Sequence, residues 1–156
     1  MADEKHPNTW PADNPAVTAH MNMLQSIINR LATQSSSCKT WCLTLAVALI
    51  SFAGATKIPG VVTFAIVPIL IFGFLDTMYL AQENAYRDLF DDVAKSIREG
   101  TYGNDRFFTA SASRTGKHVL YALGSWSIWP VYGGLLLGYT LAYCSDWLAV
   151  LTPVAK

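Results

Sequence analysis

The arrangement of apolar and polar residues divides the chain into two apolar regions with polar segments around them. The first runs from Thr40 to Leu75, and its only charged residue is Lys57. The second runs from His118 to Ser145 and contains no Lys, Arg, Asp or Glu. A helix needs about 20 apolar residues to cross the hydrocarbon core of a bilayer. Both regions are therefore predicted to enter a membrane.

The first apolar region is predicted to form a helical hairpin. Lys57 is costly in the middle of a membrane, Pro59 ends a helix, and Gly60 permits a tight turn. We expect two spans of roughly 40–57 and 60–81 on either side of this turn. The interruption makes one long helix over the whole region unfavourable.

The remaining apolar pattern predicts one further span and a long helical extension. The second apolar region is long enough for one crossing, over about 119–142, with a kink at Pro130. No helix breaker follows the second span, and its apolar positions continue with charges between them. A single helix from about 61 to 99 is therefore predicted, with Gly100 as its C-terminal cap.

A separate amphipathic helix is predicted near the N-terminus, over 14–37. Asn14 suits the cap and Pro15 the first helical position. At Ser35–Ser37 the chain either has a hinge or continues as helix into the membrane. His20 is assigned to the polar face, and the apolar face is expected to pack on the 82–99 helix, on another subunit or on lipid. The apolar face is a heptad stripe of Val17, Met21, Leu24, Ile28 and Leu31.

The fold class expected is an all-α membrane protein with three transmembrane helices. Its predicted segments are a disordered lead (1–13), the amphipathic helix (14–37), a transmembrane hairpin (38–81), a cytoplasmic helix and loop (82–117), a third transmembrane helix (118–143) and an outer tail (144–156). All of the eleven basic residues except Lys57 and Lys156 lie in 1–39 or 82–117. Because positive segments stay cytoplasmic, the N-terminus is predicted inside and the C-terminus outside the membrane.

Composition and charge exclude several other classes. Only 14% of residues are charged and the net charge is zero, so direct nucleic-acid binding is not expected. An acidic start far ahead of the first apolar run does not match a cleaved signal peptide. Of the three cysteines, Cys38 and Cys42 lie one helical turn apart; with His20 they would give an incomplete zinc site, and apolar packing is the favoured interpretation. We expect no cofactor, no metal and no enzymatic activity.

Asp76 is the strongest candidate for a functional residue, because it follows an apolar run at the inner end of a span. Ionisable groups at membrane depth are costly and often functional. Three roles are open for it: an ion or proton site at the inner mouth of a pore, a polar contact between subunits, or a residue at the membrane interface. A cytoplasmic face just below it is either a site for a partner or small ligand, or simply an aromatic anchor with a salt bridge. This face comprises Tyr79, Glu83, Tyr86 and Arg87.

A motif-level resemblance covers about residues 19–99. Its parts are Leu75-Asp76-x-x-Tyr79-Leu80-x-x-Glu83-x-x-Tyr86-Arg87-x-Leu89-Phe90 after a short hairpin, preceded by His20-Met21-x-Met23-Leu24-Gln25 and Cys38-Lys39-x-Trp41-Cys42. The pattern resembles small membrane effectors of prokaryotic anti-phage defence systems, of the SLATT-like and two-span types. The resemblance implies an oligomer that permeabilises or depolarises the inner membrane when a partner senses infection.

Two functions of different classes follow from these observations. The first is a non-enzymatic, oligomeric membrane protein that forms or gates a pore, or disturbs the membrane, on a signal from a partner. The second is a membrane anchor or scaffold that recruits a cytosolic defence enzyme and conducts no ions. A pore requires a line of small or polar residues that water can reach, whereas a scaffold requires an exposed cytoplasmic surface. The expected partners are the lipid bilayer, further copies of the chain and a cytosolic protein.

Overall fold

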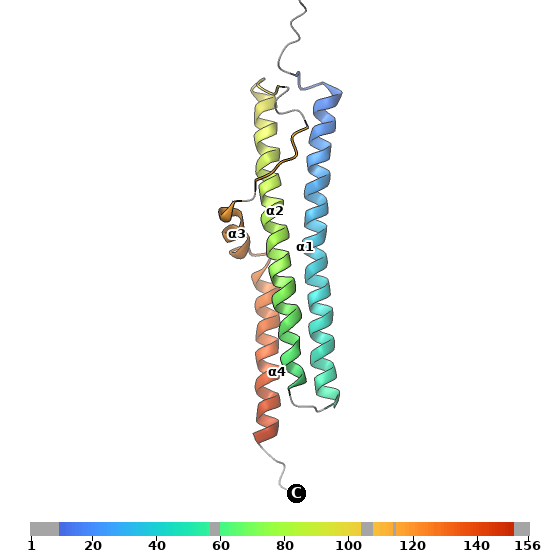
Figure 1. Cartoon of the computed structure of the whole chain (residues 1–156), viewed down its shortest axis with the longest axis vertical. Coiled ribbons are helices and arrows are strands. Elements are labelled where there is room, and N and C mark those ends of the chain that lie inside the picture. The colour runs from blue at the N-terminus through green and yellow to red at the C-terminus, as the bar shows by residue number, and fades with distance from the viewer. Residues whose placement is uncertain (1–9, 57–59, 104–107, 114, 152–156) are drawn as a thin grey trace, which may run out of the picture.

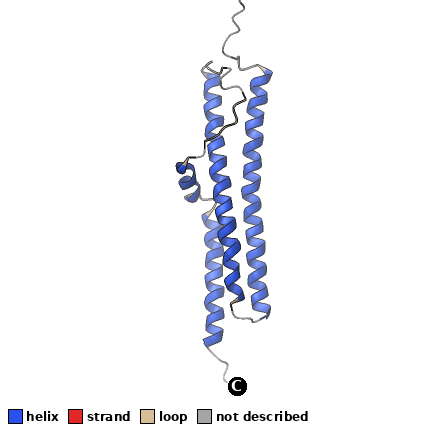
Figure 2. Cartoon of the chain, in the orientation of Figure 1, coloured by secondary structure: helices blue, strands red, loops and turns tan. Residues whose placement is uncertain are grey.

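The computed structural model describes residues 10–56, 60–103, 108–113 and 115–151, with side chains up to residue 145. Over these residues the chain is helical and has no strand, so the all-α class is confirmed (Figure 2). The long helices α1 and α2 lie side by side, and α4 runs along one half of α2 (Figure 1). The elements are α1 (Pro15–Thr56), η1 (Val61–Ala65), α2 (Ile66–Arg98), α3 (Gly116–Leu123), η3 (Trp129–Gly133) and α4 (Gly134–Leu151).

Helix α1 is a single helix of 42 residues that includes both the predicted amphipathic helix and the first span. The predicted start is confirmed, because Asn14 Oδ1 accepts a hydrogen bond of 2.9 Å from the Ala16 backbone N–H. The helix does not hinge at Ser35–Ser37. There the Ser37 hydroxyl donates to the Thr33 carbonyl one turn back, a bond that lets serine stay within a helix.

One face of α1 packs on α2 along nearly its whole length. In the predicted heptad stripe Val17, Leu24 and Ile28 are buried, and Met21 and Leu31 are half-buried. The stripe therefore contacts the extension of the second span within the same chain, which was one of the three expected partners. The same spacing continues into the apolar region, through the buried residues Ser35, Cys38, Cys42, Ala46 and Ala53.

The second long helix follows its prediction closely. Gly60 has a positive φ of 89°, which is where the chain turns into η1. Helix α2 then continues without a break to Arg98, so the helix predicted over 61–99 is confirmed as η1 plus α2. Gly100, with φ of 67°, ends it as expected of a glycine after a helix.

Two apolar clusters hold the hairpin together, one in each half. We call residues 41–75 and 120–145 the apolar half, and residues 15–40 and 76–103 the polar half. In the polar half α1 packs on the end of α2, and in the apolar half η3 and α4 join the hairpin. The polar-half cluster contains Val17, Leu24, Val93 and Tyr102. The apolar-half cluster contains Cys42, Ala46, Ile69, Ile128 and Tyr132.

The third apolar region differs from its prediction as one helix over about 119–142. It is divided into α3, a turn, the π-helical η3 and α4. Gly124 ends α3, and the Ser125 carbonyl accepts the Ile128 N–H in the turn that follows. Pro130 has no N–H to donate, which favours a break in the regular ladder. Helix α4 then continues to Leu151, beyond the predicted end.

Exposed large apolar side chains gather in the apolar half. With the single exception of Phe108, they all lie within 41–75 or 120–143. Among the described residues, α1 and the stretch Val61–Arg98 are long and apolar enough to cross a membrane, and only 22% and 33% of their most apolar windows are buried. Core helices of a soluble protein are mostly buried, so the apolar half has the surface expected for contact with lipid.

Candidate functional site

A buried ion pair lies between α1 and α2 where the polar and apolar halves meet. Asp76 follows the apolar part of α2, and its side chain has no solvent exposure. The Lys39 Nζ atom of α1 lies 3.0 Å from Asp76 Oδ1 and 2.8 Å from Oδ2. Asp76 is therefore an interior residue paired within its own chain.

Ser35 completes this site from the turn of α1 before Lys39. Its hydroxyl donates to Asp76 Oδ1 at 2.5 Å, and its Oγ accepts a hydrogen bond of 3.0 Å from Lys39 Nζ. Asp76 Oδ2 is close to Lys39 but accepts no hydrogen bond from the described residues. Both carboxylate oxygens lie within 3.0 Å of the Lys39 ammonium in the interior of the hairpin.

The chemistry of this site suits a link between helices better than a nucleophile. A serine beside a lysine can act as a nucleophile and base when the lysine is neutral. Here the Lys39 ammonium is paired with a carboxylate, and the Ser35 hydroxyl donates to Asp76 instead of to Lys39. The pair joins α1 to α2 at one level along the helix axes. Separating the helices there would leave a charge unpaired in the interior.

The cytoplasmic face predicted on α2 is partly explained by contacts within the chain. Glu83 and Arg87 form the expected pair, with Arg87 Nε and Nη2 at 2.9 Å and 2.6 Å from Glu83 Oε1. The Tyr86 hydroxyl donates to the Ala110 carbonyl at 3.0 Å, which fixes the segment before α3 to α2. Tyr79 is half-buried on the same side as Glu83. These contacts agree with the anchor and salt-bridge interpretation of the face.

A second polar cluster, which the sequence did not predict, lies in the polar half. His20 was assigned to the polar face of its helix, and that assignment is wrong because the side chain is fully buried. Its Nε2 lies 3.1 Å from the Thr109 carbonyl, which can only accept, so Nε2 carries the proton. Its Nδ1 then accepts the Tyr102 hydroxyl at 2.7 Å. Burial raises the pKa of Tyr102, opposed in part by a hydrogen bond with the Phe108 backbone, and so keeps this donor protonated.

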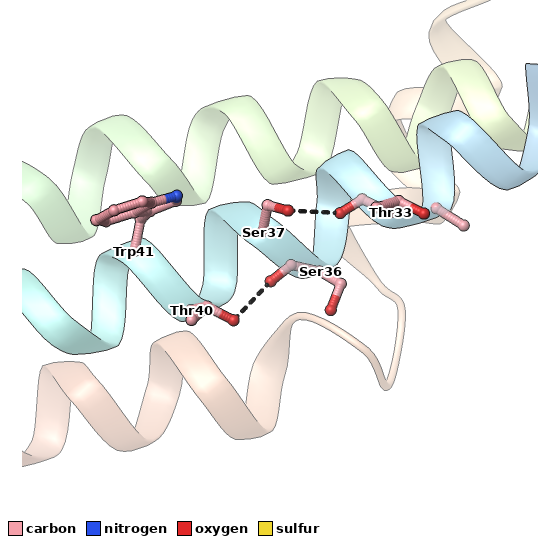
Figure 3. Close-up of a pocket in the computed structure, with 6 residues that line it drawn as sticks. Thr33, Ser36, Ser37, Thr40 and Trp41 are labelled. Carbon is pink, nitrogen blue, oxygen red and sulfur yellow. Dashed lines mark hydrogen bonds between the residues drawn. The ribbon is translucent and has the colours of Figure 1, made fainter.

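A hollow of about 530 Å³ lies along residues 32–41 of α1 (Figure 3). It is open and formed by one helix, with Trp41 at one end. Three of its hydroxyl groups, those of Thr33, Ser37 and Thr40, donate to carbonyls one turn back, as the Thr40 hydroxyl does to the Ser36 carbonyl at 3.2 Å. Their oxygens can still accept hydrogen bonds. The lining residues are Ala32, Thr33, Ser36, Ser37, Thr40 and Trp41.

Two further observations bound the chemistry. No group of three or more His, Cys, Asp or Glu side chains is arranged to hold a metal ion in the part of the chain that the structure describes. Cys38 and Cys42 are buried, free thiols on the face of α1 that packs on α2. Comparison with family models, with curated proteins and with solved structures finds no match for the chain.

Proposed function

We propose that this protein is a non-enzymatic, oligomeric protein of a bacterial inner membrane that forms or gates a pore. In this proposal α1, the η1–α2 stretch and η3–α4 each cross the bilayer with their apolar-half residues. The N-terminus and the 82–117 segment lie in the cytoplasm and the C-terminus lies outside. The distribution of exposed apolar side chains and the concentration of Lys and Arg in 1–39 and 82–117 support this arrangement.

The observation that carries the proposal is a row of small and hydroxyl side chains on α1. These residues lie on the side of the helix opposite to α2 and are exposed or half-exposed, although the neighbouring positions of α1 carry large apolar side chains. Contact with lipid does not explain such a row, whereas contact with a neighbouring helix or with a water-filled lumen does. We call it the hydroxyl row; it comprises Thr33, Ser37, Thr40, Thr44, Ser51 and Ala55.

The hydroxyl row favours a pore over a scaffold. A scaffold needs an exposed surface that attracts a cytosolic partner, and such surfaces usually contain large apolar anchors. In the described residues of the polar half no large apolar side chain is exposed. The membrane part of α1, by contrast, contains the row members Thr44, Ser51 and Ala55, which further copies of the chain could place around a common axis.

In this proposal the buried ion pair is the gate of the pore. Lys39 and Asp76 hold α1 and α2 together at the inner end of the apolar half, on the face of α1 opposite to the hydroxyl row. A partner that acts on the polar half would change the packing of the same two helices. We propose that such a partner triggers the change, and that the setting is anti-phage defence, which rests on the resemblance of the 75–90 segment to defence effectors.

Accessibility of substituted cysteines in proteoliposomes tests the pore. Thr44→Cys and, as a matched control, Leu43→Cys are made in a chain whose three natural cysteines are replaced by alanine or serine. Leu43 is exposed and lies about 100° around the helix from Thr44, outside the hydroxyl row. A charged methanethiosulfonate reagent should react with Thr44→Cys and reduce ion flux, and should leave Leu43→Cys unchanged. Equal reactivity at both positions, or flux unaffected by modification of Thr44→Cys, would contradict the proposal.

The defence role has its own test. Bacteria that express the protein with its neighbouring genes are challenged with phage, and membrane potential and survival of the culture are followed. Depolarisation after infection that depends on the protein is expected. Protection without depolarisation would instead favour a scaffold that recruits an enzyme.

A further inference from the structure

A second cavity lies on the opposite side of the hairpin, between α2, α3 and η3. Its volume is about 370 Å³, and its lining is almost entirely apolar. The two hydroxyl groups that line it are already used: Thr77 donates to the Gly73 carbonyl at 2.8 Å, and Tyr132 donates to the Phe72 carbonyl at 3.1 Å. Apart from the indole N–H of Trp129 at its exposed rim, the cavity therefore offers only hydrocarbon contacts, which favours a hydrocarbon chain over a polar ligand.

The cavity is a groove whose rim belongs to the exposed apolar surface. Leu70 and Phe74 of α2, Leu123 of α3 and Trp129 of η3 all line it and are all exposed. The groove is thus continuous with the surface that the proposed membrane location places against lipid. The molecule with access to it at high concentration is a lipid of the surrounding leaflet.

The polar end of the groove is defined by the direction of α3. The first turn of α3 is fixed beside Asp88 of α2, because His118 Nε2 donates to Asp88 Oδ2 at 2.9 Å. The last turn reaches the groove through Leu123, so α3 descends from the polar half toward the apolar half (Figure 1). The first turn also carries Lys117, which is exposed and has no ion pair within the described residues. Its long stem allows the ammonium group to reach a phosphate at the membrane surface.

We propose that this groove binds one acyl chain of an anionic phospholipid from the cytoplasmic leaflet, with the headgroup at Lys117. The proposal rests on the membrane location in the proposed function but not on oligomerisation or conduction. The bound chain lies between α2 and η3, so the groove makes the position of the third apolar region dependent on lipid.

Quenching of tryptophan fluorescence by lipids with brominated acyl chains tests the proposal on the full chain. One version keeps Trp129 as its only tryptophan, and the other keeps Trp126, which does not line the groove and is 88% exposed. The vesicles are phosphatidylcholine with phosphatidylglycerol, and either lipid carries the bromine. Trp129 should be quenched by phosphatidylglycerol with about a fivefold preference, the size that one lysine near a membrane surface provides. Trp126 should show no comparable preference.

Three variants distinguish lipid binding in the groove from lipid contact with the surface around it. Leu136→Phe fills the groove and should abolish the preference, whereas Leu137→Phe changes the adjacent, exposed leucine outside the groove and should retain it. Lys117→Gln should also abolish the preference, because it removes the cation from an exposed position. Equal quenching of Trp129 by both lipids in the parent chain would overturn the proposal while leaving the membrane location intact. Absence of quenching at both tryptophans would overturn the membrane location as well.

Discussion

The buried pair of Lys39 and Asp76 leads to a prediction in which the two partners are not equivalent. The Asp76 side chain has no solvent exposure, whereas 19% of the Lys39 side chain is exposed. Lys39→Ala leaves a buried carboxylate with only the Ser35 hydroxyl, and loss of one partner of a buried pair costs about 3–5 kcal/mol. Asp76→Asn leaves an ammonium that can turn toward water, so its cost should be about 1.5–3 kcal/mol, the value for lost hydrogen bonds to a charge.

Thermal unfolding in detergent measures this difference. For a chain of this size each kcal/mol shifts Tm by about 2–4 °C, so Lys39→Ala should lower Tm by about 6–20 °C. A larger loss in Asp76→Asn than in Lys39→Ala would refute the reasoning from burial.

The double variant Lys39→Met with Asp76→Leu separates stability from gating. Replacement of a buried ion pair by apolar residues is often neutral or stabilising, by about 1–4 kcal/mol. We therefore expect a Tm at or above that of the parent chain, together with flux that no longer responds to the trigger. A double variant as unstable as Lys39→Ala would show that the surrounding helices do not accept apolar packing here. Normal gating in the double variant would show that the ion pair has no part in the gating mechanism.

Two further predictions concern packing elsewhere in the chain. Tyr102→Phe removes the donor to His20 Nδ1 and leaves a buried acceptor unpaired, which should cost about 1–3 kcal/mol in chemical unfolding; an unchanged midpoint would show that the bond contributes nothing. Gly73→Ala places a Cβ 3.3 Å from the ring of Tyr132, and the overpacking cost of about 1–3 kcal/mol should exceed the gain of about 0.5–1 kcal/mol from alanine within a helix, so that stability falls. Its control, Gly54→Ala, meets open space within a helix and should raise stability by about 0.5–1 kcal/mol; equal effects of the two changes would contradict the packing argument.

The hairpin and its register could be predicted because their signals are local. Pro59 and Gly60 mark the turn within a few residues, and Gly100 marks the end of α2 in the same way. The heptad stripe predicted the face of α1 that packs on α2, and its extension to Ser35 would have placed that residue at the interface as well. Both signals are contained in short windows of sequence.

The candidate site could not be predicted to the same extent because its partners are distant in sequence. Lys39 and Asp76 are 37 residues apart, and His20 and Thr109 are 89 apart, so neither contact leaves a periodic pattern. In the sequence Lys39 is one of the basic residues of the 1–39 segment, and this pattern does not reveal its role in the pair. His20 was assigned by residue type, although a histidine with both ring nitrogens bonded can be fully buried.

The mass and image of the protein in lipid nanodiscs test the central claim most directly, because a pore along the hydroxyl row requires several copies around one axis. We predict a closed ring in which the α1 face carrying Thr40, Thr44 and Ser51 lines a central channel, and in which Thr44→Leu, but not Leu43→Ile, reduces the number of copies or closes the channel. A monomer, or an assembly whose α1 hydroxyl row faces lipid, would contradict the account.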